Sequence, residues 1–156
     1  MIALRETAAG APRKMAAKAP RKAAGNPRHD PREAHYRAMI DYLRSTTIAS
    51  GTRDERFHAI FLDKSNAYLG DAGFGHGCGP SLSLRMRELF GRALELGAGG
   101  IVIAHNHPSG DCRPSDSDIA ATRRLSAVGA ALDIELLDHL VITSDAVFSM
   151  RAGGLL

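Results

Sequence analysis

The residues best suited to chemistry lie in the segment 105–108, which reads His-Asn-His-Pro, and in Asp118 shortly after it. Side chains two apart on an extended chain point to the same face, so His105 and His107 present two imidazoles together while Asn106 turns away. The tract that follows is long enough for a helix to bring Asp118 beside them. Two imidazoles and a carboxylate suit zinc and leave a fourth tetrahedral position open for water, as in catalytic sites.

A zinc ion in such a site lowers the pKa of its water to about 7, and a carboxylate must then accept and pass on the proton. Two upstream glutamates are candidates. Glu55 precedes the apolar run Phe57–Leu62, and a strand edge beside the histidine strand can aim it across the open position, so it is the first choice. It also fits an ordinary surface charge. Glu88 is the alternative, although its arginine-rich helix is typical of a solvated face.

The pair Ser115 and Asp118 has a second interpretation. Ser-x-x-Asp is the spacing of a capping arrangement at the start of a helix, in which serine and the acidic residue bind each other's backbone amides. The two roles are compatible, since Ser115 can cap the helix while Asp118 points at a metal ion. We therefore expect a helix to begin near Ser115.

Other histidines and the two cysteines are weaker candidates. His139 favours a structural role or one supporting a ligand. Cys112 lies between the predicted ligands, where a thiolate can approach a metal, but an unreactive reduced thiol is the simpler interpretation. His76 and Cys78 lie among glycines and are too few to define a second site.

The elements that must position these residues follow from hydrophobic periodicity. The predicted order is α-β-β-α-β-α-β-β, which indicates an α/β or α+β fold with one mixed sheet flanked by helices. Helices are predicted from Asp30, Ser83 and Ser115, and strands over Phe57–Leu62, Ala67–Leu69, Ile101–Ala104, Ile134–Thr143 and Ala146–Met150. The residues predicted to face inward on the helices include Tyr36, Met39, Ile40, Leu43, Met86, Leu89, Phe90, Ala93, Leu96, Ala121, Leu125, Val128 and Leu132.

The full pattern His105-x-His107-x(7)-Ser115-x-x-Asp118 resembles the JAMM (MPN+) metalloprotease signature. The string HNHPSGD, with its flanking EL-x-A-x-x-I-V-I-A-H and L-L-D-H-L-V-I-T, resembles the RadC family from about Arg53 to the C-terminus. The resemblance implies a JAMM/MPN-like fold and metal ligands His105, His107 and Asp118. It further implies that Ser115 hydrogen-bonds the reacting oxygen and that the upstream glutamate is Glu55.

Charge divides the chain of 156 residues into two parts. Residues 1–30 hold seven basic and two acidic residues, which leaves thirteen basic and fifteen acidic residues for the rest. Residues 1–29 lack apolar periodicity and are predicted to be a disordered, Ala/Pro-rich basic tail preceding a domain of residues 30–156. Such a tail can attract nucleic acid weakly and without sequence preference.

Two cysteines without a C-x-x-C pair, and no apolar run near the 18 or so residues of a membrane span, favour a reduced, cytoplasmic protein without membrane contact. We therefore expect a zinc-dependent hydrolase acting on an amide or isopeptide bond of a peptide substrate. The alternatives are a metal-containing interaction module, a DNA-repair-associated protein recruited by its basic tail, and a metal-dependent nuclease.

Overall fold

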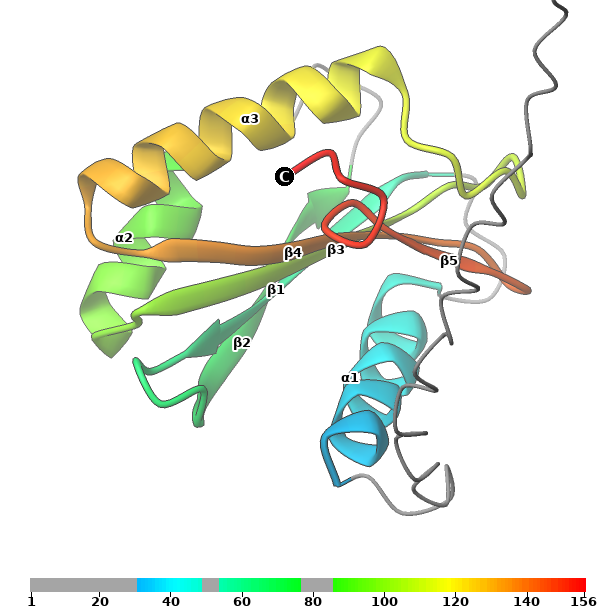
Figure 1. Ribbon diagram of the computed structural model, residues 1–156. Helices are drawn as coiled ribbons and strands as arrows, with labels where there is room; N and C mark the ends of the chain where they lie inside the picture. Colours follow the sequence, from blue (N-terminus) through cyan, green and yellow to red (C-terminus); the bar gives the residue numbers. More distant parts are fainter. Residues whose placement is uncertain (1–30, 49–53, 77–85) are drawn as a thin grey trace, which may run out of the picture. The chain divides into compact units, whose positions relative to one another are not determined.

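The computed structural model describes residues 31–48, 54–76 and 86–156 (Figure 1). The predicted tail, residues 1–29, lies outside these ranges, as do Cys78 and the side chain of His76. The predicted order of helices and strands is confirmed. The elements are α1 (Pro31–Thr47), β1 (Arg56–Leu62), β2 (Tyr68–His76), α2 (Met86–Leu96), β3 (Gly100–Asn106), α3 (Asp116–Ala131), β4 (Glu135–Ile142) and β5 (Val147–Ser149).

The strands form one mixed sheet in the order β2-β1-β3-β4-β5. β1 is antiparallel to both β2 and β3, β3 and β4 run parallel, and β5 returns antiparallel to β4. β3 is therefore central, and each of its seven residues is buried. This position explains why the segment Ile101–Ala104 is continuously apolar, because a central strand is covered on both faces.

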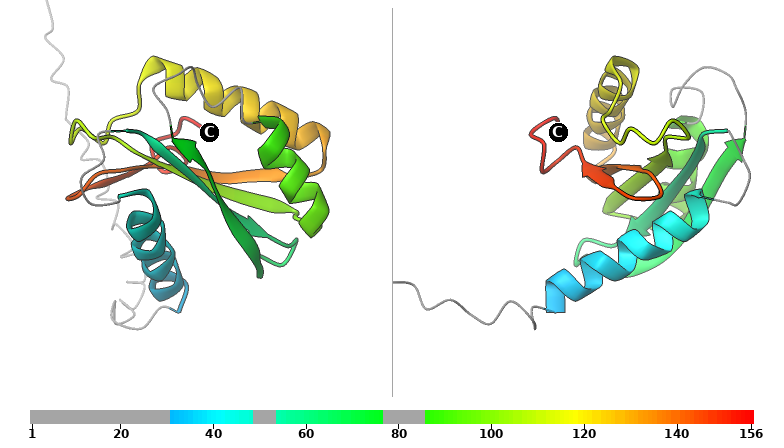
Figure 2. Two further views of the ribbon diagram at one scale, coloured as in Figure 1. Left: turned by 180° about the vertical axis from the view of Figure 1, so that it is seen from behind. Right: turned by 90° about the vertical axis from the view of Figure 1, so that its right-hand side faces the viewer.

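Helices cover both faces of the sheet (Figures 1 and 2). On one face, α2 and α3 pack on a core that contains Phe61, Ile103 and Leu125. On the other face, α1 packs through the fully buried Leu43 on Ile60 and Leu140. The fold is therefore a mixed sheet flanked by helices, consistent with a JAB/MPN-like architecture.

Two inward predictions and one strand length were wrong. Tyr36 is 41% exposed although it lies on α1, and Leu132 is 37% exposed because it caps the end of α3 instead of lying within it. β2 extends to His76, well beyond the predicted Ala67–Leu69. Its glycine-rich sequence has no strand pattern of its own, and pairing with β1 stabilises it.

The last turn of α3 lies close to the backbone that leads into β4. A Cβ atom on Gly129 would lie 2.5 Å from the carbonyl oxygen of Ile134, so only glycine allows the turn from α3 into β4 at this spacing. Among the described helices, none is long and apolar enough to cross a membrane.

Candidate metal centre

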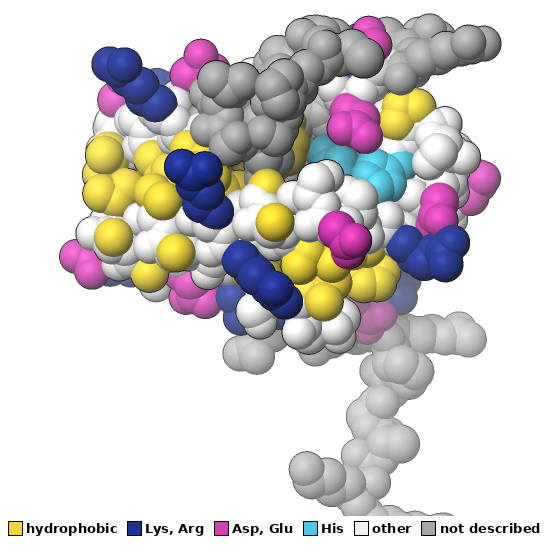
Figure 3. All heavy atoms as spheres, turned by 90° about the horizontal axis from the view of Figure 1, so that it is seen from above, with side chains coloured by type: hydrophobic (Ala, Val, Ile, Leu, Met, Phe, Trp, Pro, Cys, Tyr) yellow, Lys and Arg dark blue, Asp and Glu magenta, His cyan; other side chains and the backbone are white. Residues whose placement is uncertain are grey.

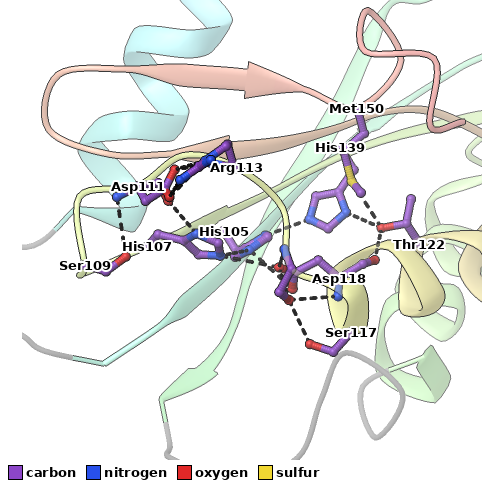
Figure 4. A network of polar contacts seen from close by, with 11 residues as sticks. His105, His107, Ser109, Asp111, Arg113, Ser117, Asp118, Thr122, His139 and Met150 are labelled. Carbon is purple, nitrogen blue, oxygen red and sulfur yellow. Dashed lines mark hydrogen bonds and ion pairs between the residues drawn. The ribbon is translucent and has the colours of Figure 1, made fainter.

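His105, His107 and Asp118 meet where β3 ends and α3 begins (Figure 4). His105 belongs to the strand and is 3% exposed, His107 is the first residue after it, and Asp118 lies in the first turn of α3. One nitrogen or oxygen atom from each lies within 4.8 Å of the others. We call these three residues the metal cluster. Among the described residues they form a group with the composition of a metal site, and Cys112 is not part of it.

The distances within the metal cluster suit a small ion with short bonds. The two Nε2 atoms of His105 and His107 are 3.0 Å apart. Asp118 places Oδ1 3.6 Å from His105 Nε2 and Oδ2 3.4 Å from His107 Nε2. Tetrahedral ligands held about 2.0–2.1 Å from zinc are separated by roughly 3.3 Å, and each of these three distances is close to that value.

The proton on His107 is located by its neighbour. Nδ1 lies 2.7 Å from the backbone carbonyl oxygen of Asp111, and a carbonyl oxygen only accepts, so Nδ1 carries the proton. In the neutral imidazole this leaves a lone pair on Nε2, the atom that faces His105. The tautomer of His107 is therefore the one that a metal ligand needs.

A buried chain of hydrogen bonds indicates that Nδ1 of His105 also carries the imidazole proton. The hydroxyl of Thr122 lies 2.6 Å from the carbonyl oxygen of Asp118 and must donate to it, so it accepts from Nδ1 of His139 at 2.6 Å. His139 Nε2 then accepts from Nδ1 of His105 at 2.7 Å. Burial, followed by the nearby His105, lowers the pKa of His139 well below its ordinary value and keeps it neutral. Nε2 of His105 therefore also presents a lone pair to the cluster.

The three inward groups are thus all acceptors. Asp118 is half-buried, and its Oδ2 accepts hydrogen bonds from the backbone N–H and the hydroxyl of Ser115. Two lone pairs and a carboxylate at these distances repel one another unless a proton or a metal cation lies between them. The arrangement can hold a metal ion. At this end of the molecule, histidine atoms reach the surface with acidic side chains beside them (Figure 3).

Ser115 holds Asp118 in place at the start of α3. The backbone N–H and the hydroxyl of Ser115 both donate to Asp118 Oδ2, at 2.8 and 2.6 Å, and Ser115 Oγ accepts from the backbone N–H of Asp118 at 3.2 Å. The predicted capping box is therefore present. Ser115 donates to Oδ2 alone, so Oδ1, which lies 3.6 Å from His105 Nε2, is the oxygen of Asp118 with more freedom to bind a metal.

The loop between the ligands is held by an ion pair. Arg113 binds both carboxylate oxygens of Asp111, at 2.6 Å for the shortest contact, and lowers the pKa of that carboxyl to about 2. Gly110 has a φ of +83°, a backbone conformation that favours glycine. The loop thereby keeps the Asp111 carbonyl facing His107. The half-buried Cys112 lies between these two paired residues.

The two candidate glutamates lie on different elements. β1 pairs with β3 so that Phe57 is opposite His105, and the Phe57 ring stacks on the His105 imidazole with centroids 6.0 Å apart. Phe57 and His105 are the last pair of this register, and the exposed Glu55 lies two residues before Phe57. Glu88 is exposed in the first turn of α2, which packs on β1 and β2. Glu55 therefore precedes the strand that pairs with the histidine strand, whereas Glu88 belongs to a helix.

Asn106 was missed as a functional candidate. It turns away from the ligands, as expected, but its amide reaches β1: Oδ1 accepts from the backbone N–H of Arg56 at 2.6 Å, and Nδ2 donates to the carbonyl oxygen of Asp54 at 3.3 Å. No local pattern signals this contact, because it depends on which strand lies beside β3.

A separate cavity of about 510 Å³ lies at the opposite end of the sheet. Its lining includes Lys64, Gly99 and Asp133, which follow β1, precede β3 and follow α3. It shares no residue with the metal cluster. Volume alone therefore does not mark the position of the candidate site.

Comparison with known families matches residues 33–155 to the RadC-like JAB domain. This match spans most of the chain and includes the whole metal cluster. The chain belongs to the RadC family. The resemblance to the RadC family and to JAB/MPN domains that the His-x-His pattern indicated is therefore confirmed.

Relatives of this RadC-like chain carry the name UPF0758 protein. One from Rhodobacter capsulatus is 39% identical over 121 residues, which cover 78% of this chain and 56% of the relative. Another, from Ruegeria pomeroyi, is 39% identical over 119 residues, covering 76% of this chain and 52% of the relative. A Burkholderia thailandensis relative is 38% identical over 118 residues, covering 75% and 44%. The chain therefore spans about half the length of the curated relatives it matches.

Proposed function

We propose that this RadC-like domain is a zinc-dependent hydrolase of the JAMM metallopeptidase type that cleaves an amide or isopeptide bond. The observation that carries the proposal is the hydrogen bonding of the two histidines: Nδ1 of His105 faces His139 and Nδ1 of His107 faces the carbonyl oxygen of Asp111, so both Nε2 atoms are directed at Asp118. Three nitrogen and oxygen ligands with a further open position are typical of catalytic zinc.

When bound, zinc supplies a water of lowered pKa and polarises the carbonyl group of the substrate. Glu55 accepts the proton of the attacking water and delivers it to the leaving nitrogen. The position of Glu55 in the sequence, two residues before the Phe57 that pairs with His105, supports this role.

Ser115 stabilises the negative charge that develops on the substrate oxygen. Its hydroxyl is exposed and lies at the edge of the metal cluster. For this role the hydroxyl turns away from Asp118 Oδ2, which the backbone N–H of Ser115 still holds at 2.8 Å.

The test compares Glu55→Gln with Glu88→Gln, a matched change of an exposed glutamate on another element. We expect both variants to retain one zinc per chain, measured by elemental analysis after dialysis. On a panel of peptides and isopeptide-linked conjugates, Glu55→Gln should lower turnover by roughly 10²–10⁴-fold, as for loss of a general base. Glu88→Gln should match the wild type.

Three results contradict the proposal. Absence of stoichiometric metal in the wild type would show that the metal cluster does not bind zinc. Unchanged turnover in Glu55→Gln would show that Glu55 is not the proton acceptor. If the zinc-loaded chain cleaves no member of the panel, an interaction module becomes the better account, and His105-dependent nicking of plasmid DNA favours a nuclease.

A further inference from the structure

Asn106 bridges two strands at the point where their backbone pairing stops. The register between β1 and β3 ends at Phe57 and His105. One residue further along β3, the side chain of Asn106 takes over: it accepts from the N–H of Arg56 and donates to the carbonyl of Asp54. Asn106 is only 5% exposed, so its amide is held within the protein.

These two hydrogen bonds hold both peptide groups of Glu55. The carbonyl of Asp54 belongs to the peptide unit before Glu55, and the N–H of Arg56 belongs to the unit after it. The donor of one unit and the acceptor of the other are therefore bound to a single planar amide, at 2.6 and 3.3 Å. A carboxamide suits this task because it carries an acceptor and donors on one rigid group.

The backbone of Asn106 is fixed from the other side. It pairs with Ile142 of β4, and the next residue, His107, donates its backbone N–H to Ile142 oxygen at 3.0 Å. Beyond His105 the chain thus follows β4, while the Asn106 side chain spans the gap to β1. His107 and the segment that carries Glu55 are consequently both fixed with respect to Asn106.

We infer that Asn106 is a positioning residue, which fixes the Glu55 backbone relative to the metal ligand His107. This inference rests on the proposed role of Glu55 as proton acceptor. Glu55 itself is exposed and lies just before β1, so Asn106 supplies the restraint that strand pairing no longer provides. A displacement of about 1 Å at a reacting group lowers rates by about 10²-fold, which makes such a restraint important for catalysis.

The test uses the full chain with Asn106→Ala and Asn106→Asp. The aspartate keeps the shape of the side chain and the acceptor for Arg56 N–H but loses the donor to Asp54. We expect amide exchange at Arg56, followed by NMR, to accelerate at least 10-fold in the alanine variant and less in the aspartate variant. Exchange at Ile60 and Val102 should stay unchanged in both, which excludes general unfolding.

A second readout reports the position of Glu55 without requiring a substrate. In Co²⁺-loaded protein, the paramagnetic shift of the Glu55 carboxyl carbon should fall by at least half in Asn106→Ala, while the shifts of His139 are retained. Zinc affinity should change less than 3-fold. Where a substrate is cleaved, kcat should fall 10–100-fold with little change in KM, and the double variant with Glu55→Gln should be no slower than Glu55→Gln alone.

Several outcomes overturn the inference. Unchanged Arg56 exchange or an unchanged Glu55 shift in Asn106→Ala shows that the amide does not restrain Glu55. A loss of zinc comparable to that of His107→Ala shows that Asn106 acts on the ligands instead. If the decreases in kcat caused by Asn106→Ala and Glu55→Gln simply multiply in the double variant, Asn106 does not act through Glu55. If the wild type cleaves nothing, the proposed hydrolase fails, while the exchange and paramagnetic shifts still decide whether Asn106 positions Glu55.

Discussion

Two polar clusters lie on opposite faces of the same sheet, and they differ in their balance of donors and acceptors. On the α1 face, the carboxylate of Asp71 accepts from the Tyr42 hydroxyl at 2.7 Å, from His58 Nε2 at 2.8 Å and from the Tyr68 hydroxyl. We call these four residues the Asp71 cluster. On the α3 face, the metal cluster directs two lone pairs and a carboxylate inward.

The Asp71 cluster is satisfied by its own members. Burial opposes ionisation of Asp71, but hydrogen bonds from Tyr68, Tyr42 and His58 outweigh it and lower its pKa. The same contact with Asp71 raises the pKa of Tyr42 to about 12, because the neutral phenol is the donor. Donors and acceptors balance, so the cluster ties α1 to β1 and β2 and requires no ion.

The difference shows how a structural cluster can be told from a ligand-binding one. Both contain histidine and aspartate, and both are partly buried. Only the metal cluster has its protons directed outward, into Asp111 and His139. A surplus of acceptors costs free energy unless a proton or a metal cation is bound, whereas a balanced network is stabilising.

The sharpest test of this comparison is loss of metal. We expect His107→Ala to remove stoichiometric zinc, because only two ligands remain. Asp71→Asn should bind zinc as the wild type does, since the Asp71 cluster lies on the other face. Elemental analysis and competition with a chromophoric chelator measure both. Equal losses in the two variants would contradict the distinction between the clusters.

Metal removal should produce the next largest effect, on stability. At free zinc near 1,000 times the Kd, binding to the native state alone stabilises it by about 4 kcal/mol, or roughly 8–16 °C in Tm for a chain of this size. Calorimetry with and without EDTA should show this shift in the wild type and in Asp71→Asn. His107→Ala serves as the control, and an EDTA effect of the same size there would mean that zinc binds elsewhere.

The hydrogen-bond chain behind His105 should have an intermediate effect. Thr122→Val removes the hydroxyl that receives the His139 proton, and we expect zinc affinity to fall by about 10-fold, as for loss of a partner of a metal ligand. Thr122→Ser keeps the hydroxyl and should bind zinc almost normally. Similar affinities for the valine and serine variants would show that the chain does not set the tautomer of His105.

The smallest effect is expected at the Asp71 cluster. Asp71→Asn leaves one donor without its acceptor and should lower the free energy of unfolding by about 1 kcal/mol at pH 7. Because the folded-state pKa of Asp71 is lowered, its contribution is present above about pH 4 and is lost as pH falls through the folded-state value. Urea unfolding should therefore show the gap between wild type and variant closing at low pH. A gap that widens in acid would contradict this assignment.

Local patterns in the sequence were enough to predict the order of the elements and the three residues that meet in the metal cluster. Alternation along β3 places His105 and His107 on one face, and the Ser-x-x-Asp spacing predicts the start of α3 near Ser115. These features depend on backbone dihedral angles within a few residues, so neighbouring residues encode them. The glycine-rich β2 was underestimated because its stability comes from pairing with β1.

The tertiary structure decided which residues from distant parts of the chain form hydrogen bonds with His105 and Asn106. His139 lies 34 positions from His105, and Asn106 lies 50 positions from Arg56, yet these contacts set the tautomer of one ligand and hold the backbone around Glu55. Contacts over such separations depend on strand order and register, which hydrophobic periodicity leaves open. For this reason the sequence alone predicted the group of His105, His107 and Asp118, whereas the arrangement of the sheet revealed the contacts of His139 and Asn106.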